Sequence, residues 1–142
     1  MAVTNADNQE LKLKKNIKDY FLKTRPLLEA GLCPTANLFS ASMDKWSLFC
    51  IMNLGYYKVL RFNQLKTNID GISARMLSVT LKKLENNGIL KRKVYPEVPP
   101  RVEYTLTTFG EGFAERLVDM GHWLLANSEK LKTIHKEESL GS

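Results

Sequence analysis

Cysteine and histidine are both scarce in this chain, with two residues of each among 142. Two cysteines far apart in the sequence do not make a disulfide framework, so a reducing cytoplasm is the expected compartment. His122 and His135 are isolated, and neither stands with cysteines or carboxylates at metal-ligand spacing. The sequence therefore predicts no disulfide-rich secreted domain, no metal site and no cofactor.

Long apolar runs and the common enzyme motifs are also missing. No apolar run approaches the ~20 residues that a membrane-spanning helix needs, and residues 1–10 lack the apolar middle of a secretion signal. There is no glycine-rich phosphate loop, no His-Glu-x-x-His, no nucleophile elbow and no Cys-x-x-Cys. We therefore expect a protein that is not an enzyme and does not enter a membrane, with one hydrophobic core.

The most informative stretch is residues 71–107, where a helical pattern leads into two strand-like segments. Ser73 is a good N-cap, and Gly88 can adopt the left-handed backbone that ends a helix. The positions expected to face the core recur every three or four residues: Met76, Leu77, Thr80, Leu81 and Leu84. Segments 89–95 and 102–106 flank a loop with three prolines. A helix followed by a stiff hairpin is typical of a DNA-binding winged helix-turn-helix.

Charge is distributed unevenly along the chain. Residues 75–101 hold seven basic and two acidic residues. Seven minus two gives a net charge of +5 for this stretch, close to the formal net charge of +6 for the whole chain. Residues 10–25 hold six basic and two acidic residues, whereas residues 103–138 hold four basic and seven acidic ones. A basic face opposite an acidic one favours binding to a polyanion. The alternative is an ordinary solvated lysine-rich surface, and the helix-plus-hairpin context favours nucleic acid.

The remaining elements are mostly helical. An amphipathic helix is expected over residues 11–28, with Pro26 as a kink or break and Gly31 as its stop. Asp44 should cap a buried helix that ends at Gly55. A short strand is expected over residues 56–60, a helix over 62–69 with Asn63 as its cap, and a long helix that begins at Thr107 or Thr108. The predicted fold is mainly α with a small β-hairpin wing, an α+β winged helix-turn-helix.

Two helices longer than this core requires should form a homodimer. We expect a disordered tail over residues 1–9, a dimerisation arm over 10–32, the DNA-binding domain over 33–107, a C-terminal dimerisation helix over 108–136 and a tail over 137–142. Their apolar stripes need a partner, and a second copy is the simplest one. The residues expected to meet there are Ile17, Tyr20, Phe21, Phe113, Leu117, Met120 and Leu124.

A set of short motifs lies along the chain: Cys33-Pro34, Lys45-Trp46, RFNQL at 61–65, GISARML at 71–77, LENNG at 84–88, YPEVPPRVEYTLT at 95–107, and Gly110. Together and in this order they resemble the HxlR-type family of winged helix-turn-helix transcriptional regulators. The resemblance implies a small dimeric regulator that binds double-stranded DNA. Two features depart from the family pattern: Met43-Asp44 replaces a small glycine pair, and the arm before Cys33 is longer.

The expected DNA contacts lie on the outward side of the second helix and on the hairpin. In the helix they are Ser73, Ala74, Arg75, Ser78, Val79 and Lys82, and toward the DNA backbone they are Lys83, Lys91, Lys93, Tyr95 and Arg101. Arg75 is the best candidate for a base, because its planar fork can donate to both acceptors of guanine. An ion pair between Arg75 and Asp70 is the competing interpretation.

Strand alternation divides the hairpin residues between two faces. Leu90 and Val94 should face inward, and so should Arg92, which we expect to pair with Glu85 or Glu103 rather than touch DNA. Lys91, Lys93 and Tyr95 should then point outward.

Cys33 is the candidate for redox sensing. A thiol at a helix N-terminus favours its reactive thiolate form, and in the resembled family the cysteine of this Cys-Pro pair often senses oxidants or electrophiles. The alternative is a helix cap without a signalling role. Cys50 should be an inert core residue.

Two further hypotheses remain open. Trp46 and Trp123 are expected to anchor packing, yet a dimer-interface pocket for a small-molecule effector could be lined by Trp46, Phe49, Tyr56, Tyr57, Phe113 and Trp123. Use of the winged helix for RNA or for protein contact is the other alternative.

Overall fold

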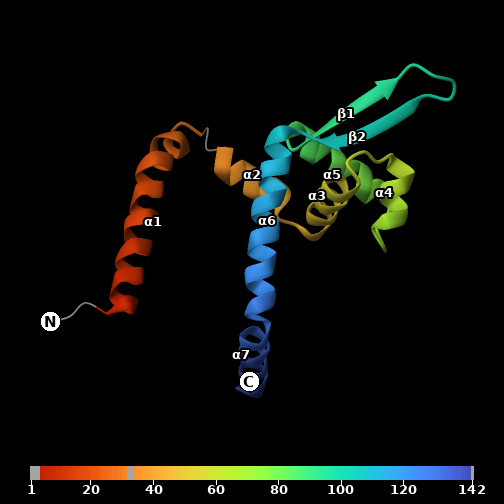
Figure 1. Cartoon of the computed structure of the whole chain (residues 1–142). Coiled ribbons are helices and arrows are strands. Elements are labelled where there is room, and N and C mark those ends of the chain that lie inside the picture. The colour runs from red at the N-terminus through yellow and green to blue at the C-terminus, as the bar shows by residue number, and fades with distance from the viewer. Residues whose placement is uncertain (1–3, 32–33, 142) are drawn as a thin grey trace. The chain divides into compact units, whose positions relative to one another are not determined.

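The computed structural model describes residues 4–31 and 34–141, which form two compact units (Figure 1). The first unit, Met1–Ser40, contains α1 (Asn5–Glu29) and most of α2 (Pro34–Ser42). The second unit, Ala41–Ser142, contains the remaining elements. They are α3 (Lys45–Tyr57), α4 (Phe62–Asn68), α5 (Ala74–Asn86), β1 (Leu90–Tyr95), β2 (Arg101–Leu106), α6 (Thr108–Ala126) and α7 (Ser128–Leu140).

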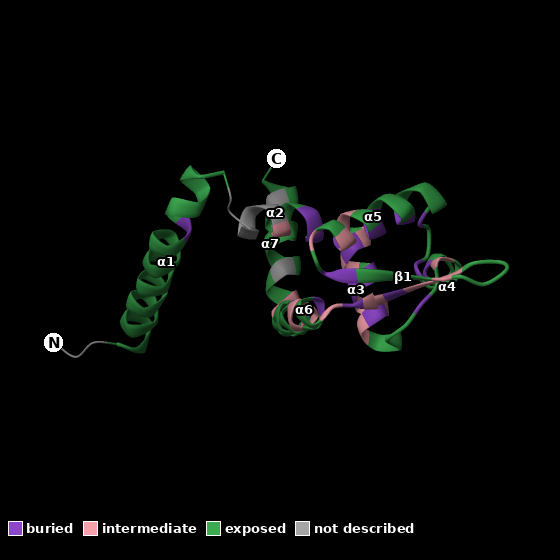
Figure 2. Cartoon of the chain, turned by 90° about the horizontal axis from the view of Figure 1, so that it is seen from above, coloured by how far each residue is buried: buried purple, intermediate pink, exposed green. Residues whose placement is uncertain are grey.

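The core of the second unit forms around α3, which packs against α5, α6 and β2. Cys50, Ile51 and Leu54 of α3 are almost completely buried, and they meet the apolar side of α5. Figure 2 shows the buried residues gathered in this unit, whereas α1 is exposed along nearly all of its length. The predicted mainly helical winged helix-turn-helix is therefore confirmed. No helix among the described residues is long and apolar enough to cross a bilayer.

The Asp44 carboxylate joins the start of α3 to α5. Its Oδ1 accepts hydrogen bonds from the backbone N–H groups of Trp46 and Ser47 at 3.1 and 3.0 Å, which confirms the predicted N-cap. Its Oδ2 accepts from Ser47 Oγ and from Lys83 Nζ, each at 2.6 Å. Burial by itself would raise the pKa of Asp44, but the hydrogen bonds from Lys83 and Ser47 and the charge of Lys83 lower it to about 2.

Thr107 and Gly110 join the hairpin to α6. Thr107 Oγ1 donates to the Gly88 carbonyl at 2.5 Å and accepts from the Gly110 N–H at 2.9 Å, so Thr107 is the N-cap of α6. A Cβ atom at Gly110 would lie 1.9 Å from the Ile89 carbonyl oxygen. This junction therefore has room only for glycine.

The hairpin is antiparallel, with Leu90 opposite Leu106 and Tyr95 opposite Arg101. The short strand expected over residues 56–60 is reduced to one bridge, in which Leu60 and Tyr104 exchange backbone hydrogen bonds of 2.8 and 3.1 Å. The reason is that α3 continues through Gly55 to Tyr57 and leaves too little chain for a strand. Lys58, with φ 70°, then turns the chain toward this bridge.

Several other boundaries also differ from the sequence-based expectation. Helix α1 begins at Asn5, before the expected start, because Thr4 and Asp7 form a capping box. It continues through Pro26, which lies in its last turn, where one lost main-chain hydrogen bond is tolerated. The α4 helix begins after Arg61, whose N–H donates to Gln64 Oε1 at 2.8 Å, so Asn63 is not the cap.

The long C-terminal helix expected over residues 108–136 is divided in two. Asn127 Nδ2 donates to the Trp123 carbonyl at 2.8 Å, and this side-chain hydrogen bond competes with continuation of the helix. Helix α7 then extends to Leu140, beyond the expected start of the tail at residue 137.

We predict opposite effects of alanine at two glycines of α6. Gly110→Ala should lower the free energy of unfolding by about 2–3 kcal/mol, because Ile89 backbone atoms must move. At Gly121 no heavy atom lies within 4 Å of an added Cβ. Gly121→Ala should therefore raise the free energy of unfolding by about 0.5–1 kcal/mol, because alanine favours the helix more than glycine does. Urea denaturation of both variants measures the difference, and equal stabilities would contradict the close approach at Gly110.

The lowered pKa of Asp44 predicts an acid-dependent loss of stability. The ionised carboxylate stabilises the fold fully above its ordinary pKa of 3.8, and this contribution is lost as the pH falls through about 2. Asn is also a good N-cap, so the Asp44→Asn variant keeps a capping side chain and removes only the negative charge. The stability difference between the wild type and Asp44→Asn should be largest at pH 6 and should shrink between pH 4 and 2. Asp70→Asn serves as the control, and a pH-independent difference for Asp44→Asn would contradict the assignment.

Candidate nucleic-acid interface

The recognition helix α5 presents one buried side and one exposed side. Ser73 Oγ accepts a hydrogen bond from the Met76 N–H at 3.0 Å, which confirms the predicted cap. Leu77, Thr80, Leu81 and Leu84 are buried as expected, but Met76 is 41% exposed because it lies at the edge of the packed face. The six residues expected to face DNA, at positions 73–75, 78, 79 and 82, are all exposed.

Arg75 is available for a ligand. No ion pair involves its guanidinium within the described part of the chain, so the expected alternative of pairing with Asp70 is not observed. Lys82 lies one turn away from Ser78 and pairs with Glu85 at 3.2 Å, in a contact that is mostly exposed to solvent. Such a pair is weak and can exchange for a phosphate.

Lys83 is half-buried and forms an ion pair with the start of α3. Its Nζ lies 2.6 Å from Asp44 Oδ2, and the pair connects α5 to the N-terminus of α3. The expected phosphate contact of Lys83 stays a prediction, and Lys83 would have to exchange this ion pair to make it. The apolar periodicity of α5 does not reveal the ion pair, because Asp44 is 39 residues away in the sequence.

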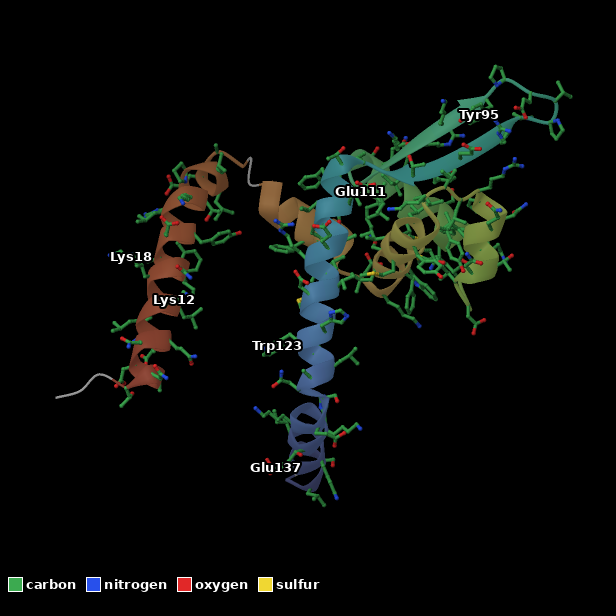
Figure 3. The ribbon with its side chains drawn as sticks, viewed as in Figure 1. Lys12, Lys18, Tyr95, Glu111, Trp123 and Glu137 are labelled. Carbon is green, nitrogen blue, oxygen red and sulfur yellow. The ribbon has the colours of Figure 1, made fainter. Side chains whose placement is uncertain are left out.

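Two basic side chains of the hairpin, those of Lys93 and Arg101, contact other residues of the hairpin. Tyr95, labelled on the hairpin in Figure 3, has Lys93 Nζ 4.8 Å and Arg101 Cζ 4.0 Å from its ring centroid. Arg101 also lies 3.3 Å from a Glu97 carboxylate oxygen and 3.4 Å from one of Glu103. Arg101 is thus neutralised within the hairpin, where we expected it to reach DNA. Its contacts stiffen the wing.

Arg92 lies on the predicted inner side of the hairpin, opposite the buried Tyr104, but without the expected ion pair among the described residues. It pairs with neither Glu85 nor Glu103 among the described residues, because Lys82 and Arg101 take those partners. Beyond Leu90, strand β1 projects past the core, so Arg92 is exposed and Val94 is 49% exposed. Arg92 lines a cavity of about 230 Å³ between the hairpin and α5, together with Ser78 and Lys82. An exposed, unpaired cation beside the recognition helix is a further candidate for a phosphate contact.

Of the two cysteines, the structure describes Cys50 alone. Cys33 lies outside the described residues; it directly precedes α2, which begins at Pro34. Cys50 is completely buried, and burial together with the negative charge of Asp44 raises the pKa of its thiol to about 12. Cys50 therefore stays protonated and inert, as expected.

The residues expected at a dimer interface are exposed with one clear exception. Ile17, Tyr20 and Phe21 of α1 are 44–62% exposed. On α6, Met120 and Leu124 are exposed and Phe113 is half-buried, but Leu117 is only 7% exposed because it packs into the core of its own chain. Leu117 is therefore not available to a second copy.

The aromatic residues proposed to line an effector pocket between two copies do not share one cavity within a single chain. Trp123, expected to anchor packing, is 64% exposed on α6 (Figure 3). Trp46 is half-buried and lies 6.4 Å from Phe49, centroid to centroid. Of the six aromatic residues, Tyr56 alone lines the cavity described between α3 and α6. The proposed pocket lies at a dimer interface and needs a second copy, so it stays a prediction.

The fold and the exposed basic helix together define a helix-turn-helix regulator of transcription. The chain belongs to the HxlR-like helix-turn-helix family, because a model of that family matches residues 43–132. Helix α1 precedes the matched region. Members of the family are transcriptional regulators and not enzymes, so the chain is a DNA-binding transcriptional regulator of the helix-turn-helix type.

Individual relatives agree with this assignment. The HTH-type transcriptional regulator YtfH of Escherichia coli K12 is 32% identical over 114 residues, which cover 79% of this chain and 88% of YtfH. Among solved structures, the redox regulator HypR in its reduced form is 32% identical, with a TM-score of 0.63 over 70% of this chain and 98% of HypR. Diamide-treated YodB of Bacillus subtilis is 35% identical, with a TM-score of 0.55 over 61% of this chain and 84% of YodB.

Proposed function

We propose that two copies of this chain bind a palindromic operator in double-stranded DNA, with α5 in the major groove and the hairpin beside it. The observation that carries the proposal is the exposed face of α5, where Arg75 has no ion-pair partner among the described residues. Arg92 of the hairpin lines a cavity with Ser78, Lys82 and Glu85 of α5. Exposed cations on the second helix of a helix-turn-helix favour a phosphate backbone.

Base reading and backbone binding fall to different residues. The N-terminal part of a recognition helix lies nearest the base edges, so Arg75 and Ser78 would read bases and Val79 could meet a thymine methyl group. Ser73 and Ala74 lie at the helix start and complete this face. Lys82, Lys91, Lys93 and Arg92 would contact phosphates, which position the protein without carrying sequence information.

The homodimer is supported by apolar side chains that are exposed within each of the two units. On α1 these residues are Ile17, Tyr20 and Phe21, and on α6 they are Met120, Leu124 and the half-buried Phe113. Exposed apolar stripes on helices are typical of interfaces between chains. A dimer would place two recognition helices about 34 Å apart, one turn of DNA, so the operator should be an imperfect palindrome.

Oxidation of Cys33 is the candidate signal. Its support comes from the relatives: HypR is described as a redox regulator, and YodB was crystallised after treatment with the thiol oxidant diamide. Cys33 is also the thiol that directly precedes a helix, whereas Cys50 is sealed in the core. A helix N-terminus stabilises a thiolate.

Arginine substitutions should separate base reading from phosphate binding. Operator fragments can be selected from genomic DNA with the wild-type protein and then used in mobility-shift titrations. Arg75→Ala should reduce discrimination between the operator and a scrambled duplex by about 1–3 kcal/mol. Arg92→Ala should weaken both duplexes alike and reduce the salt slope by about one.

Lys136→Ala is the matched control, because it removes one positive charge from α7, at the end of α6 remote from the hairpin (Figure 1). Unchanged discrimination in Arg75→Ala would refute its base-reading role, and a sequence-selective loss in Arg92→Ala would refute its phosphate role. Tighter binding of duplex RNA or heparin than of operator DNA would instead favour the alternative of another polyanion.

The redox proposal is tested with the same operator. Diamide should weaken or strengthen operator binding by the wild type several-fold, and dithiothreitol should restore it, because thiol oxidation is reversible at this level. Cys33→Ser should abolish the response, whereas Cys50→Ala should retain it. An unaltered affinity of the oxidised wild type would exclude Cys33 as a sensor.

A further inference from the structure

A groove between α3 and α6 has the size of a small-molecule site. Its volume is about 650 Å³, within the range of pockets that hold drug-sized ligands. Helix α3 supplies Ile51 and Tyr56, the end of β2 supplies Leu106, and α6 supplies Val118 and Glu115. The groove lies entirely within the second unit of the chain.

The floor of the groove is apolar and its edge is aromatic. Ile51 and Leu106 are buried core residues whose surfaces form the floor, and Gly55 leaves room above Leu106 because it has no side chain. Tyr56 at the edge is 79% exposed and makes an edge-to-face contact with Tyr57 at 4.8 Å. The negative face of such a ring attracts organic cations.

The α6 side of the groove carries three negative charges in one line. Glu111, Glu115 and Asp119 follow at four-residue spacing, so they lie along the same side of the helix, and all three are exposed. Like charges at this spacing destabilise a helix. Glu111 lies in the first turn of α6, where the helix dipole stabilises a negative charge. Glu115 and Asp119 lie beyond the first turn, where the helix dipole does not offset their repulsion.

No protein cation neutralises this line. Lys58 also lines the groove, but none of the three carboxylates forms an ion pair within the described part of the chain. An anionic ligand would be repelled, and a neutral one would leave the carboxylates uncompensated. Charge and shape thus select a ligand with a hydrophobic body and a positive charge.

We propose that this groove binds an organic cation with a hydrophobic body. The apolar floor would take the body, while Tyr56, Glu115 and Asp119 hold the charge. The apolar stripe expected at the dimer interface, Phe113, Met120 and Leu124, lies on another side of α6 than the carboxylates of the groove. With 3.6 residues per turn, that stripe is roughly 150° from the carboxylate line.

Tetraphenylphosphonium is a suitable probe, and isothermal titration calorimetry without DNA measures its binding. The wild type should bind tetraphenylphosphonium at least about tenfold more tightly than the neutral triphenylphosphine oxide. Glu115→Gln with Asp119→Asn should weaken the phosphonium about tenfold, because both charges face the ligand. Tyr56→Ala should weaken it about threefold or more.

Glu137→Gln is the matched control, because it removes one charge from an exposed carboxylate on α7, outside the groove (Figure 3). It should leave binding unchanged. The proposal is overturned if the neutral probe binds as tightly as the phosphonium, or if the groove variants bind it like the wild type. A loss of the same size in Glu137→Gln would also overturn it, since general charge attraction would then explain the binding. These titrations contain no DNA, so their outcome is independent of operator binding.

Discussion

The Asp44 carboxylate determines how the two central helices of the DNA-binding unit are held together. It caps the N-terminus of α3 by accepting two backbone hydrogen bonds, and it also binds the ammonium group of Lys83 on α5. A lowered pKa of about 2 keeps this group ionised over the whole physiological range. The contact adds to the apolar packing of Cys50, Ile51 and Leu54 of α3 against α5.

A second constraint acts where the hairpin meets α6. Thr107 binds the Gly88 carbonyl and caps α6, and Gly110 approaches the Ile89 carbonyl so closely that no other residue fits. The end of α5, the base of the wing and the start of α6 are therefore joined at one point. The groove proposed to bind an organic cation lies between α3 and α6, the helices that this junction and Asp44 hold in place. A ligand bound there would contact α3 and α6, and α3 packs against α5.

Much of the candidate DNA-binding face could be anticipated from residue order. Ser73 and Gly88 bound α5 by their local chemistry, and the spacing of Leu77, Leu81 and Leu84 separates its buried side from its exposed side. The partners of the charged residues could not be anticipated. Lys83 and Arg101 were expected to be open to DNA and are bound to carboxylates, whereas Arg92 was expected to be bound and is unpaired. Ion pairs depend on distances between residues remote in sequence, which periodicity does not encode.

The sequence by itself determined the class of the protein, the succession of α5, hairpin and α6, and the exposed face of α5. These follow from caps, turns and apolar spacing, which act over a few residues, and from motifs shared with a family. Tertiary structure alone decided that Leu117 is a core residue, that Asp44 connects α3 to α5, and that three carboxylates of α6 face an open apolar groove. The physical reason is that burial and charge pairing are set by whichever segments the packed core brings together.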